Sequence, residues 1–308
     1  MKTRVITGSI IGLICAGFFG LRFVSPYIFD IMIAIIMVCG AGEVSKVFNR
    51  SGRYNNMTLG TIFPVTVFLT ILLGVYFKLS FVYVLLIELA LFVLFSMGVF
   101  LWTLLDKKAK KQELLADEKP SDYVIKKTLL SMMVFAYPSL ILSSLFYINH
   151  LTDFGLTASS DSMIGFFVLL VVFVSTMLTD VCAYFVGSTI KGKKLCPYIS
   201  PNKTVSGAIG GLIGSVIGCI VLYFVFLNVG SFATIFADAK LSIWLMVGYS
   251  LIASVVSQAG DIFASWLKRT ARTKDFSTIF PGHGGFMDRC DGLAFNALFS
   301  LIVFALIF

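Results

Sequence analysis

Many ionisable side chains lie between residues 258 and 292, in a stretch flanked by two apolar segments. The chain is 58% hydrophobic and only 13% charged, so composition alone does not account for this concentration. Carboxylates are the hard oxygen ligands that Mg²⁺ prefers, and Lys and Arg bind phosphates, a combination that a metal-bound nucleoside triphosphate requires. We therefore interpret the stretch as the active-site loop of a membrane enzyme. Its ionisable residues are Asp261, Asp275, Asp288, Asp291, His283, Lys268, Arg269, Arg272, Lys274 and Arg289.

Asp261 lies near the end of the apolar segment that leads into this loop, which we expect to be helical from about residue 241. In a helix, Asp261, Ser265 and Lys268 are spaced i, i+4 and i+7 and share one face, with Gln258 one turn earlier. An aspartate near the end of a membrane helix can simply face water. A carboxylate at this depth is nevertheless costly unless it is paired, hydrated or bound to a cation, which favours a functional role.

The PGHGG sequence from residue 281 to 285 places glycines and a proline around His283. Such a backbone can turn tightly and bring its N–H groups close to an anion. Asp288 and Asp291 follow at i and i+3, where the last apolar run begins. These carboxylates could cap a helix, or Asp288 could bind Mg²⁺ together with Asp261, and the spacing leaves both interpretations open.

A second polar group extends from Asp180 to Gly211. Asp180 and Tyr184 are one helical turn apart and can face the same site. The loop after them is rich in groups that bind phosphate. An ordinary cytoplasmic loop explains its lysines, but not the pattern P-x-I-S-P-N-K-T before a glycine-rich helix start. The phosphate-binding candidates are Lys191, Lys193, Lys194, Ser200, Asn202, Lys203, Thr204 and Ser206.

The sequence SWLKRTARTKDFSTIFPGHGGFMDRCD, residues 265–291, closely resembles the signature of the phosphatidate cytidylyltransferase family, also called CDP-diacylglycerol synthases. Many fixed positions in a short segment make this a specific match. Cys290 departs from the aliphatic residue or Thr usual at its position, a mild change at a packing site. The matching residues are Ser265, Lys268, Arg269, Lys274, Asp275, Ser277, Pro281, His283, Gly284, Gly285, Asp288, Arg289 and Asp291.

The earlier polar group also resembles this family, in which an Asp-x-x-Ala-Tyr-x-x-Gly helix precedes a Ser-Pro-x-Lys-Thr loop. The family usually continues with a Glu where this chain has Ser206. Any role of that Glu is therefore absent here or supplied by another residue, for which Glu43 is a candidate. Glu43 could equally face lipid headgroups. The resemblance covers residues 180 to 291, and the first 127 residues add no specific motif.

The resemblance implies that CTP and phosphatidate react to give CDP-diacylglycerol and pyrophosphate, a step of phospholipid biosynthesis. No Ser-His or Cys-His nucleophile is evident, so we expect direct in-line attack on the α-phosphorus of CTP. It also implies a bacterial inner-membrane location and suggests a homodimer.

We assign roles to the polar residues on this basis. Asp261 and Asp288 are expected to bind Mg²⁺, with Asp291 or Asp180 on a second cation. Lys268 and Arg269 are expected to act in catalysis with the two aspartates. The expected substrate-binding residues are Ser200, Lys203, Thr204, Ser265, Lys274, His283, Gly284, Gly285 and Arg289.

Two alternatives remain at the level of sequence. A related CTP-dependent lipid kinase would transfer the γ-phosphoryl group, although the nearly complete signature argues against it. A membrane transporter could use charged groups between helices as an ion path. Its charges would however be expected at the membrane midplane on broken helices, not in loops.

The elements that must position these residues are membrane helices. The mean hydropathy is +0.96, and the apolar runs approach the roughly 20 residues that span a bilayer. We predict an all-α polytopic membrane protein of about nine helices, with residues 1–127 as an N-terminal part and 128–308 as the catalytic part. The expected spans are 5–24, 26–46, 57–77, 80–104, 128–148, 162–190, 205–230, 241–266 and 290–308.

The distribution of basic residues predicts the orientation. With the N-terminus in the cytoplasm, twenty-one Lys and Arg lie on the cytoplasmic side and three on the other. Basic residues near helix ends stay in the cytoplasm, so the active site should face it. The net charge of +8 then reflects the basic residues that orient the helices in the membrane, and it does not indicate nucleic-acid binding.

Overall fold

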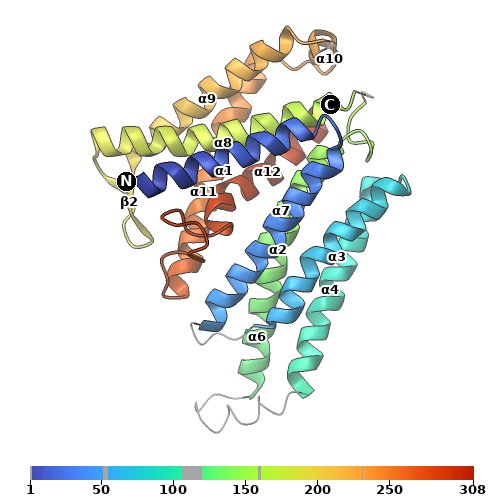
Figure 1. Ribbon diagram of the computed structural model, residues 1–308, viewed down its shortest axis with the longest axis vertical. Helices are drawn as coiled ribbons and strands as arrows, with labels where there is room; N and C mark the ends of the chain where they lie inside the picture. The colour runs from blue at the N-terminus through green and yellow to red at the C-terminus, as the bar shows by residue number, and fades with distance from the viewer. Residues whose placement is uncertain (1, 51–54, 106–119, 159–160, 231) are drawn as a thin grey trace. The chain divides into compact units, whose positions relative to one another are not determined.

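The computed structural model describes residues 2–50, 55–105, 120–158, 161–230 and 232–308, and most of these are helical (Figure 1). Eight helices are long and apolar enough to cross a membrane, and a shorter apolar helix covers Ile6–Leu21. The prediction of an all-α polytopic membrane protein is confirmed for this part of the chain. Residues 106–119, between the expected spans 80–104 and 128–148, lie outside the described residues, and the next helix begins at Pro120, earlier than predicted.

The chain forms two compact units, which are described separately below. Unit 1 contains Met1–Ser143 and Thr270–Asp288, and unit 2 contains Ser144–Arg269 and Arg289–Phe308. The sequence from 270 to 288, which carries much of the family signature, therefore belongs with the N-terminal helices. The proposed functional division at residue 127 stays a prediction.

Unit 1 consists of four long helices, a helix with a π-helical turn, and the signature loop. The turn η1 contains Pro138, which lacks the N–H that a regular helix requires, and such residues favour local rearrangement of the helix. Asn56 caps α3 by accepting a hydrogen bond from the Leu59 N–H at 3.1 Å. The helices are α1 (Lys2–Leu21), α2 (Pro26–Arg50), α3 (Met57–Tyr76), α4 (Phe81–Leu105), α6 (Pro120–Phe135), η1 (Ala136–Leu140) and the start of α7 (Ile141–Asn149).

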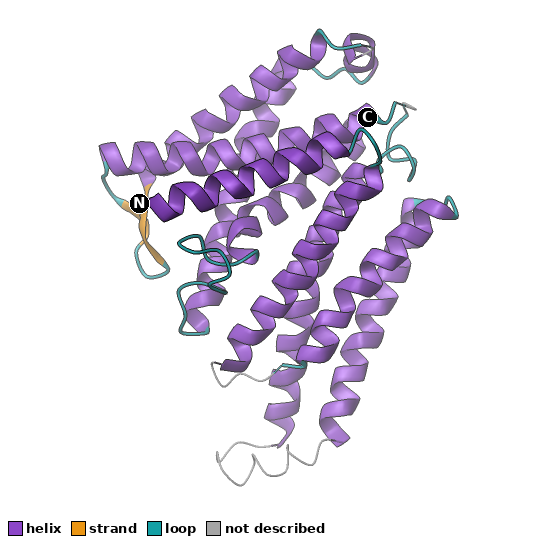
Figure 2. Ribbon diagram, in the orientation of Figure 1, coloured by secondary structure: helices purple, strands orange, loops and turns teal. Residues whose placement is uncertain are grey.

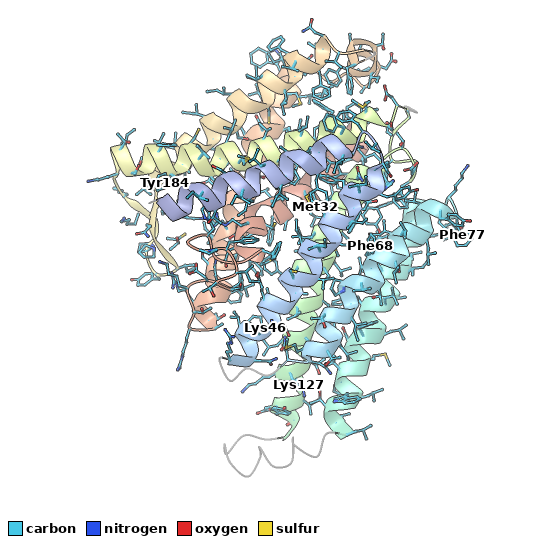
Figure 3. The ribbon with its side chains drawn as sticks, viewed as in Figure 1. Met32, Lys46, Phe68, Phe77, Lys127 and Tyr184 are labelled. Atoms are coloured by element: carbon cyan, nitrogen blue, oxygen red, sulfur yellow. The ribbon has the colours of Figure 1, made fainter. Side chains whose placement is uncertain are left out.

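The core of unit 1 is aromatic. Phe63 of α3 is fully buried, and its ring centroid lies 4.9 Å from that of Phe135 and 5.2 Å from that of Phe95. Figure 3 shows Lys46 and Lys127 toward one end of these helices and Phe77 at the other. The basic residues at one end agree with the charge pattern from which the orientation was predicted, although the orientation itself stays a prediction.

Unit 2 contains the remaining helices and one small antiparallel hairpin, drawn in orange in Figure 2. The hairpin occupies part of the segment expected to be a loop, with Lys194 opposite Thr204. Helix α11 continues to Thr270, further than predicted, so Asp261, Ser265 and Lys268 are all helical. The elements are α8 (Met163–Ile190), β1 (Lys194–Cys196), β2 (Ser200–Thr204), α9 (Val205–Leu227), α10 (Phe232–Asp238), α11 (Ile243–Thr270) and α12 (Met287–Ile307).

Helices α8 and α9 run side by side along the glycine face of α9 (Figure 1). A Cβ added at Gly214 would lie 2.5 Å from the Cys182 sulfur, and one added at Gly210 would lie 2.5 Å from the Val186 Cβ. Small residues drive helix association in membranes because they let backbones approach closely. The helical spacing of glycines in the sequence has this packing function.

We predict that Gly214→Ala lowers the free energy of unfolding by about 1–3 kcal/mol, because the added methyl group overpacks this interface. Thermal unfolding in detergent, followed by loss of the monodisperse peak, measures the effect. Gly248→Ala is the control, since a Cβ at Gly248 meets nothing within 4 Å. Equal shifts for the two variants would contradict close packing at Gly214.

Buried polar contacts also join α12 to α8. The amide nitrogen of the fully buried Asn296 lies 2.8 Å from both the Ser175 and the Thr176 hydroxyls. Such partners are needed because an unsatisfied amide in an apolar interior is costly. This contact turns the Asn296 face of α12 toward α8. Helix α12 begins within the signature.

Candidate active site

The central contact of the predicted site is an ion pair between β2 and α11. Lys203 Nζ lies 2.6 Å from Asp261 Oδ2, and the two side chains are 23% and 32% exposed. Ser265, one turn along α11, donates a long hydrogen bond of 3.5 Å to Asp261 Oδ1. The hairpin therefore places Lys203, which we predicted to bind phosphate, in contact with Asp261, which we predicted to bind metal.

Two further carboxylates belong to the same electrostatic group in unit 2. Asp180 on α8 interacts with Asp261, Lys203 and Arg289. Asp291 on α12 lies 3.9 Å from Lys268 Nζ through its Oδ2 and also interacts with Asp261 and Asp180. We refer to Asp180, Asp261 and Asp291 as the carboxylate group. Four separate elements contribute to it and to its basic partners.

The donor chemistry of the carboxylate group fits a hard divalent cation. Carboxylate oxygens are the ligands that Mg²⁺ uses, and nearby phosphates and water complete its shell. Among the described residues, however, no three His, Cys, Asp or Glu side chains converge closely enough to hold a metal ion by themselves. Asp261 forms an ion pair with the Lys203 ammonium.

The hairpin residues are held by local and long-range hydrogen bonds. Arg269 Nε donates to the carbonyl oxygen of Ile199 at 3.2 Å, which ties the hairpin turn to the end of α11. Thr204 caps α9 by accepting from the Gly207 N–H at 3.1 Å. The Ser206 hydroxyl donates to the Lys191 carbonyl and so closes the base of the hairpin. Ser200, at the start of β2, is half-buried.

The signature loop in unit 1 forms the tight turn that its glycines predict. Gly282 and Gly284 have φ values of +77° and +78°, a region that favours glycine. The Phe280 N–H donates to the Gly284 carbonyl at 2.8 Å and closes the turn around His283. The side chain of Lys274, another predicted substrate contact, is exposed in the preceding loop.

Asp288 binds backbone N–H groups that precede α12, and neither of its two partners is an N–H of that helix. Its Oδ2 accepts hydrogen bonds from the N–H groups of Gly285 and Phe276, both at 2.9 Å. The side chain is only 7% exposed. The N–H of Gly285, expected to approach a substrate anion, therefore binds a protein carboxylate. Metal binding by Asp288 stays a prediction.

Glu43 makes a contact with the signature that the sequence did not predict. Its carboxylate accepts hydrogen bonds from the N–H groups of Phe286 at 3.0 Å and Met287 at 2.9 Å. At 4% exposure it does not face lipid headgroups. Both oxygens are already engaged, so these contacts give no support to the hypothesis that Glu43 replaces the glutamate absent at position 206.

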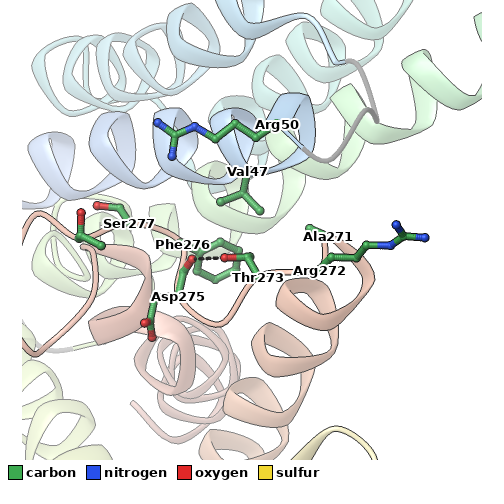
Figure 4. Close-up of a pocket in the computed structure, with 9 residues that line it drawn as sticks. Val47, Arg50, Ala271, Arg272, Thr273, Asp275, Phe276 and Ser277 are labelled. Atoms are coloured by element: carbon green, nitrogen blue, oxygen red, sulfur yellow. Dashed lines mark hydrogen bonds between the residues drawn. The ribbon is translucent and has the colours of Figure 1, made fainter.

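A cavity of about 490 Å³ lies between the end of α2 and the signature loop, within unit 1 (Figure 4). Its lining combines hydroxyl groups with two exposed arginines, Arg50 and Arg272, which extend in different directions in Figure 4. The hydroxyl of Thr273 donates to the Asp275 carbonyl at 3.0 Å, and both residues line the cavity. The other lining residues are Val47, Ala271, Phe276, Ser277 and Thr278.

Comparison with known proteins bears directly on this arrangement. The model of the cytidylyltransferase family matches residues 2–307. The chain belongs to the cytidylyltransferase family. It is 38% identical over 148 residues to a phosphatidate cytidylyltransferase of Brucella suis, which covers 48% of this chain and 50% of the relative. It is also 38% identical over 131 residues to one of Staphylococcus haemolyticus, covering 42% of this chain and 46% of the relative. The matched region thus spans about half the length of these curated relatives.

In this cytidylyltransferase-family protein, sequence reasoning missed the contribution of the N-terminal helices to the signature loop. The Thr7 hydroxyl donates to the Pro281 carbonyl at 3.3 Å. A Cβ at Gly8 would lie 3.4 Å from Nε2 of His283, so α1 packs against the histidine ring. No local pattern marks these α1 residues. An acid in an apolar helix does mark Glu43, but it does not reveal the partner.

Proposed function

We propose that this protein is a phosphatidate cytidylyltransferase that converts CTP and phosphatidate to CDP-diacylglycerol and pyrophosphate. The observation that carries the proposal is the carboxylate group with its basic partners, in a chain of the cytidylyltransferase family. The names of the two relatives agree with it. We also propose that the site faces the cytoplasm of a bacterial cell and lies in its inner membrane, and that the chain forms a homodimer.

The reaction needs charge neutralisation more than a strong base. An oxygen of the phosphatidate phosphate, already ionised, attacks the α-phosphorus of CTP. The bond from that phosphorus to the bridging β-oxygen breaks, and pyrophosphate leaves with the electron pair. Catalysis then rests on positioning and on stabilisation of the phosphate charges.

The residues of unit 2 supply these requirements. Asp261 would hold Mg²⁺, with Asp180 or Asp291 on a second cation, and a bound metal would neutralise charge on the triphosphate. Lys203, Lys268, Arg269 and Arg289 would bind the phosphates, with Ser200 and Thr204 at the hairpin and Ser265 orienting Asp261. Lys203 would leave Asp261 as the nucleotide binds.

The signature loop of unit 1 would supply further contacts to the substrates. Its substrate contacts would come from Lys274, His283 and the glycines of the PGHGG turn. Asp288, with one oxygen engaged by two N–H groups, would contribute to metal binding through its other oxygen. Asp288→Asn tests this role, because Asn retains an oxygen that can accept from the Phe276 and Gly285 N–H groups but loses the charge.

The candidate functions differ in which phosphorus of CTP, α or γ, is transferred to the lipid. Purified protein is incubated with phosphatidate, Mg²⁺ and CTP labelled at either the α- or the γ-phosphate, and label is followed into the lipid fraction. We expect label from the α-position alone, with release of pyrophosphate. Label from the γ-position would identify a lipid kinase. No label from either position, with several lipid phosphates, would reject both enzymes and favour transport.

A further inference from the structure

We propose that Glu43 is a positioning residue, which holds the PGHGG turn and the first turn of α12 in the geometry that catalysis needs. The proposal rests on the proposed function, since the turn belongs to the family signature. Glu43 lies 243 residues before Phe286, yet its two carboxylate oxygens bind two consecutive N–H groups at the start of α12. A long-range contact thus takes the place of a local cap.

The geometry of this contact is that of a buried anion at a helix N-terminus. The first N–H groups of a helix have no partner within it and carry partial positive charge. The Glu43 carboxylate is 4% exposed and occupies the position that an external anion could otherwise take. The contact therefore fixes the helix start and keeps substrate phosphate from binding at these two N–H groups.

Glycine is required next to this carboxylate. A Cβ at Gly285 would lie 2.3 Å from Oε1 and 2.4 Å from Oε2 of Glu43, closer than any real contact. One turn earlier on α2, a Cβ at Gly40 would lie 3.3 Å from the Met287 sulfur. One face of α2 thus approaches the turn closely, and the lack of a side chain at Gly285 is what permits it.

The segment that Glu43 holds also binds Asp288. The Gly285 N–H donates to Asp288, and the next two N–H groups donate to Glu43. Three successive backbone donors are therefore shared between two buried carboxylates. If one carboxylate is removed, the backbone that places Asp288 and the residues after it on α12 can rotate.

The first test is a double-mutant cycle measured by initial rates. We expect Glu43→Ala and Gly285→Ala each to lower kcat by about 10²-fold, because small displacements of a catalytic segment have effects of this size. KM for CTP should change by no more than a few fold. The double variant should be no worse than Glu43→Ala alone, because the methyl group then fills the vacated space. Additive losses would overturn the proposal and indicate that Gly285 contacts substrate independently.

Glu88→Ala is the matched control for Glu43→Ala, since Glu88 is another glutamate of unit 1 that is buried in an apolar helix. We expect its kcat to stay within a few fold of the wild type. A loss as large as that of Glu43→Ala would overturn the proposal, because it would show a general effect of removing a buried glutamate.

Hydrogen exchange provides a readout that needs no turnover. In Glu43→Gln, the amide hydrogens of Phe286 and Met287 should exchange on the order of tenfold faster, while peptides from α4 exchange as in the wild type. Unchanged exchange at both amides would overturn the proposal. If the wild-type protein shows no cytidylyl transfer, the proposed function is rejected. The exchange rates of the Phe286 and Met287 amides would still show whether Glu43 holds the turn.

Discussion

If the proposed function is right, replacing Asp261 by Asn should lower cytidylyl transfer on the order of 10³-fold, with the protein still inserted and folded. Asn has nearly the same shape, so the variant removes the charge that would hold Mg²⁺ and leaves the helix intact. The carboxylate interacts with Lys203, Asp180 and Asp291, which makes it the common member of the site's electrostatic contacts in unit 2. Initial rates with labelled CTP measure the loss.

Asp238→Asn is the control for this variant. Asp238 ends α10 of the same unit and is exposed, so its replacement should leave the rate within about twofold of wild type, as is usual for surface changes. Retained activity in Asp261→Asn would reject the metal assignment. An equal loss in both variants would show that the assay responds to any lost carboxylate.

Replacing Lys203 by Met should reduce turnover by about 10²-fold or more while strengthening metal binding in the absence of nucleotide. The reason is the 2.6 Å ion pair, in which the Lys203 ammonium occupies the Asp261 oxygen that a metal would use. An uncharged side chain removes this competitor and also removes a phosphate ligand. The same substitution therefore has opposite effects on metal affinity and on catalysis.

Mn²⁺ binding, followed by electron paramagnetic resonance with and without CTP, checks this prediction. Wild-type protein should bind Mn²⁺ weakly without CTP and more tightly with CTP. Lys203→Met should bind Mn²⁺ more tightly than the wild type when CTP is absent, so that CTP increases its Mn²⁺ affinity by a smaller factor. Lys240→Met, at an exposed position before α11, should behave as wild type. Weaker metal binding in Lys203→Met without nucleotide would show that Lys203 does not compete for Asp261.

The cytidylyltransferase signature also shows which parts of a site can be predicted locally. The alignment of Asp261 with Ser265 follows from helix periodicity, and the structure has this contact within α11. The tight turn at Gly282 and Gly284 follows from glycine's access to positive φ. Helix capping by Asp288 was one of two open interpretations, but in the structure this carboxylate binds the N–H groups of Phe276 and Gly285, which lie before α12.

The sequence by itself determined the membrane helices, the family and most candidate site residues. Hydropathy, helix periodicity and signature spacing are properties of short segments, which the sequence expresses directly. The tertiary structure decided which distant residues meet: Lys203 with Asp261, Thr7 with Pro281, and Glu43 with Phe286 and Met287. The partner of a buried charge depends on how helices distant in sequence pack, and the sequence around Glu43 contains no information about the two N–H groups that it binds.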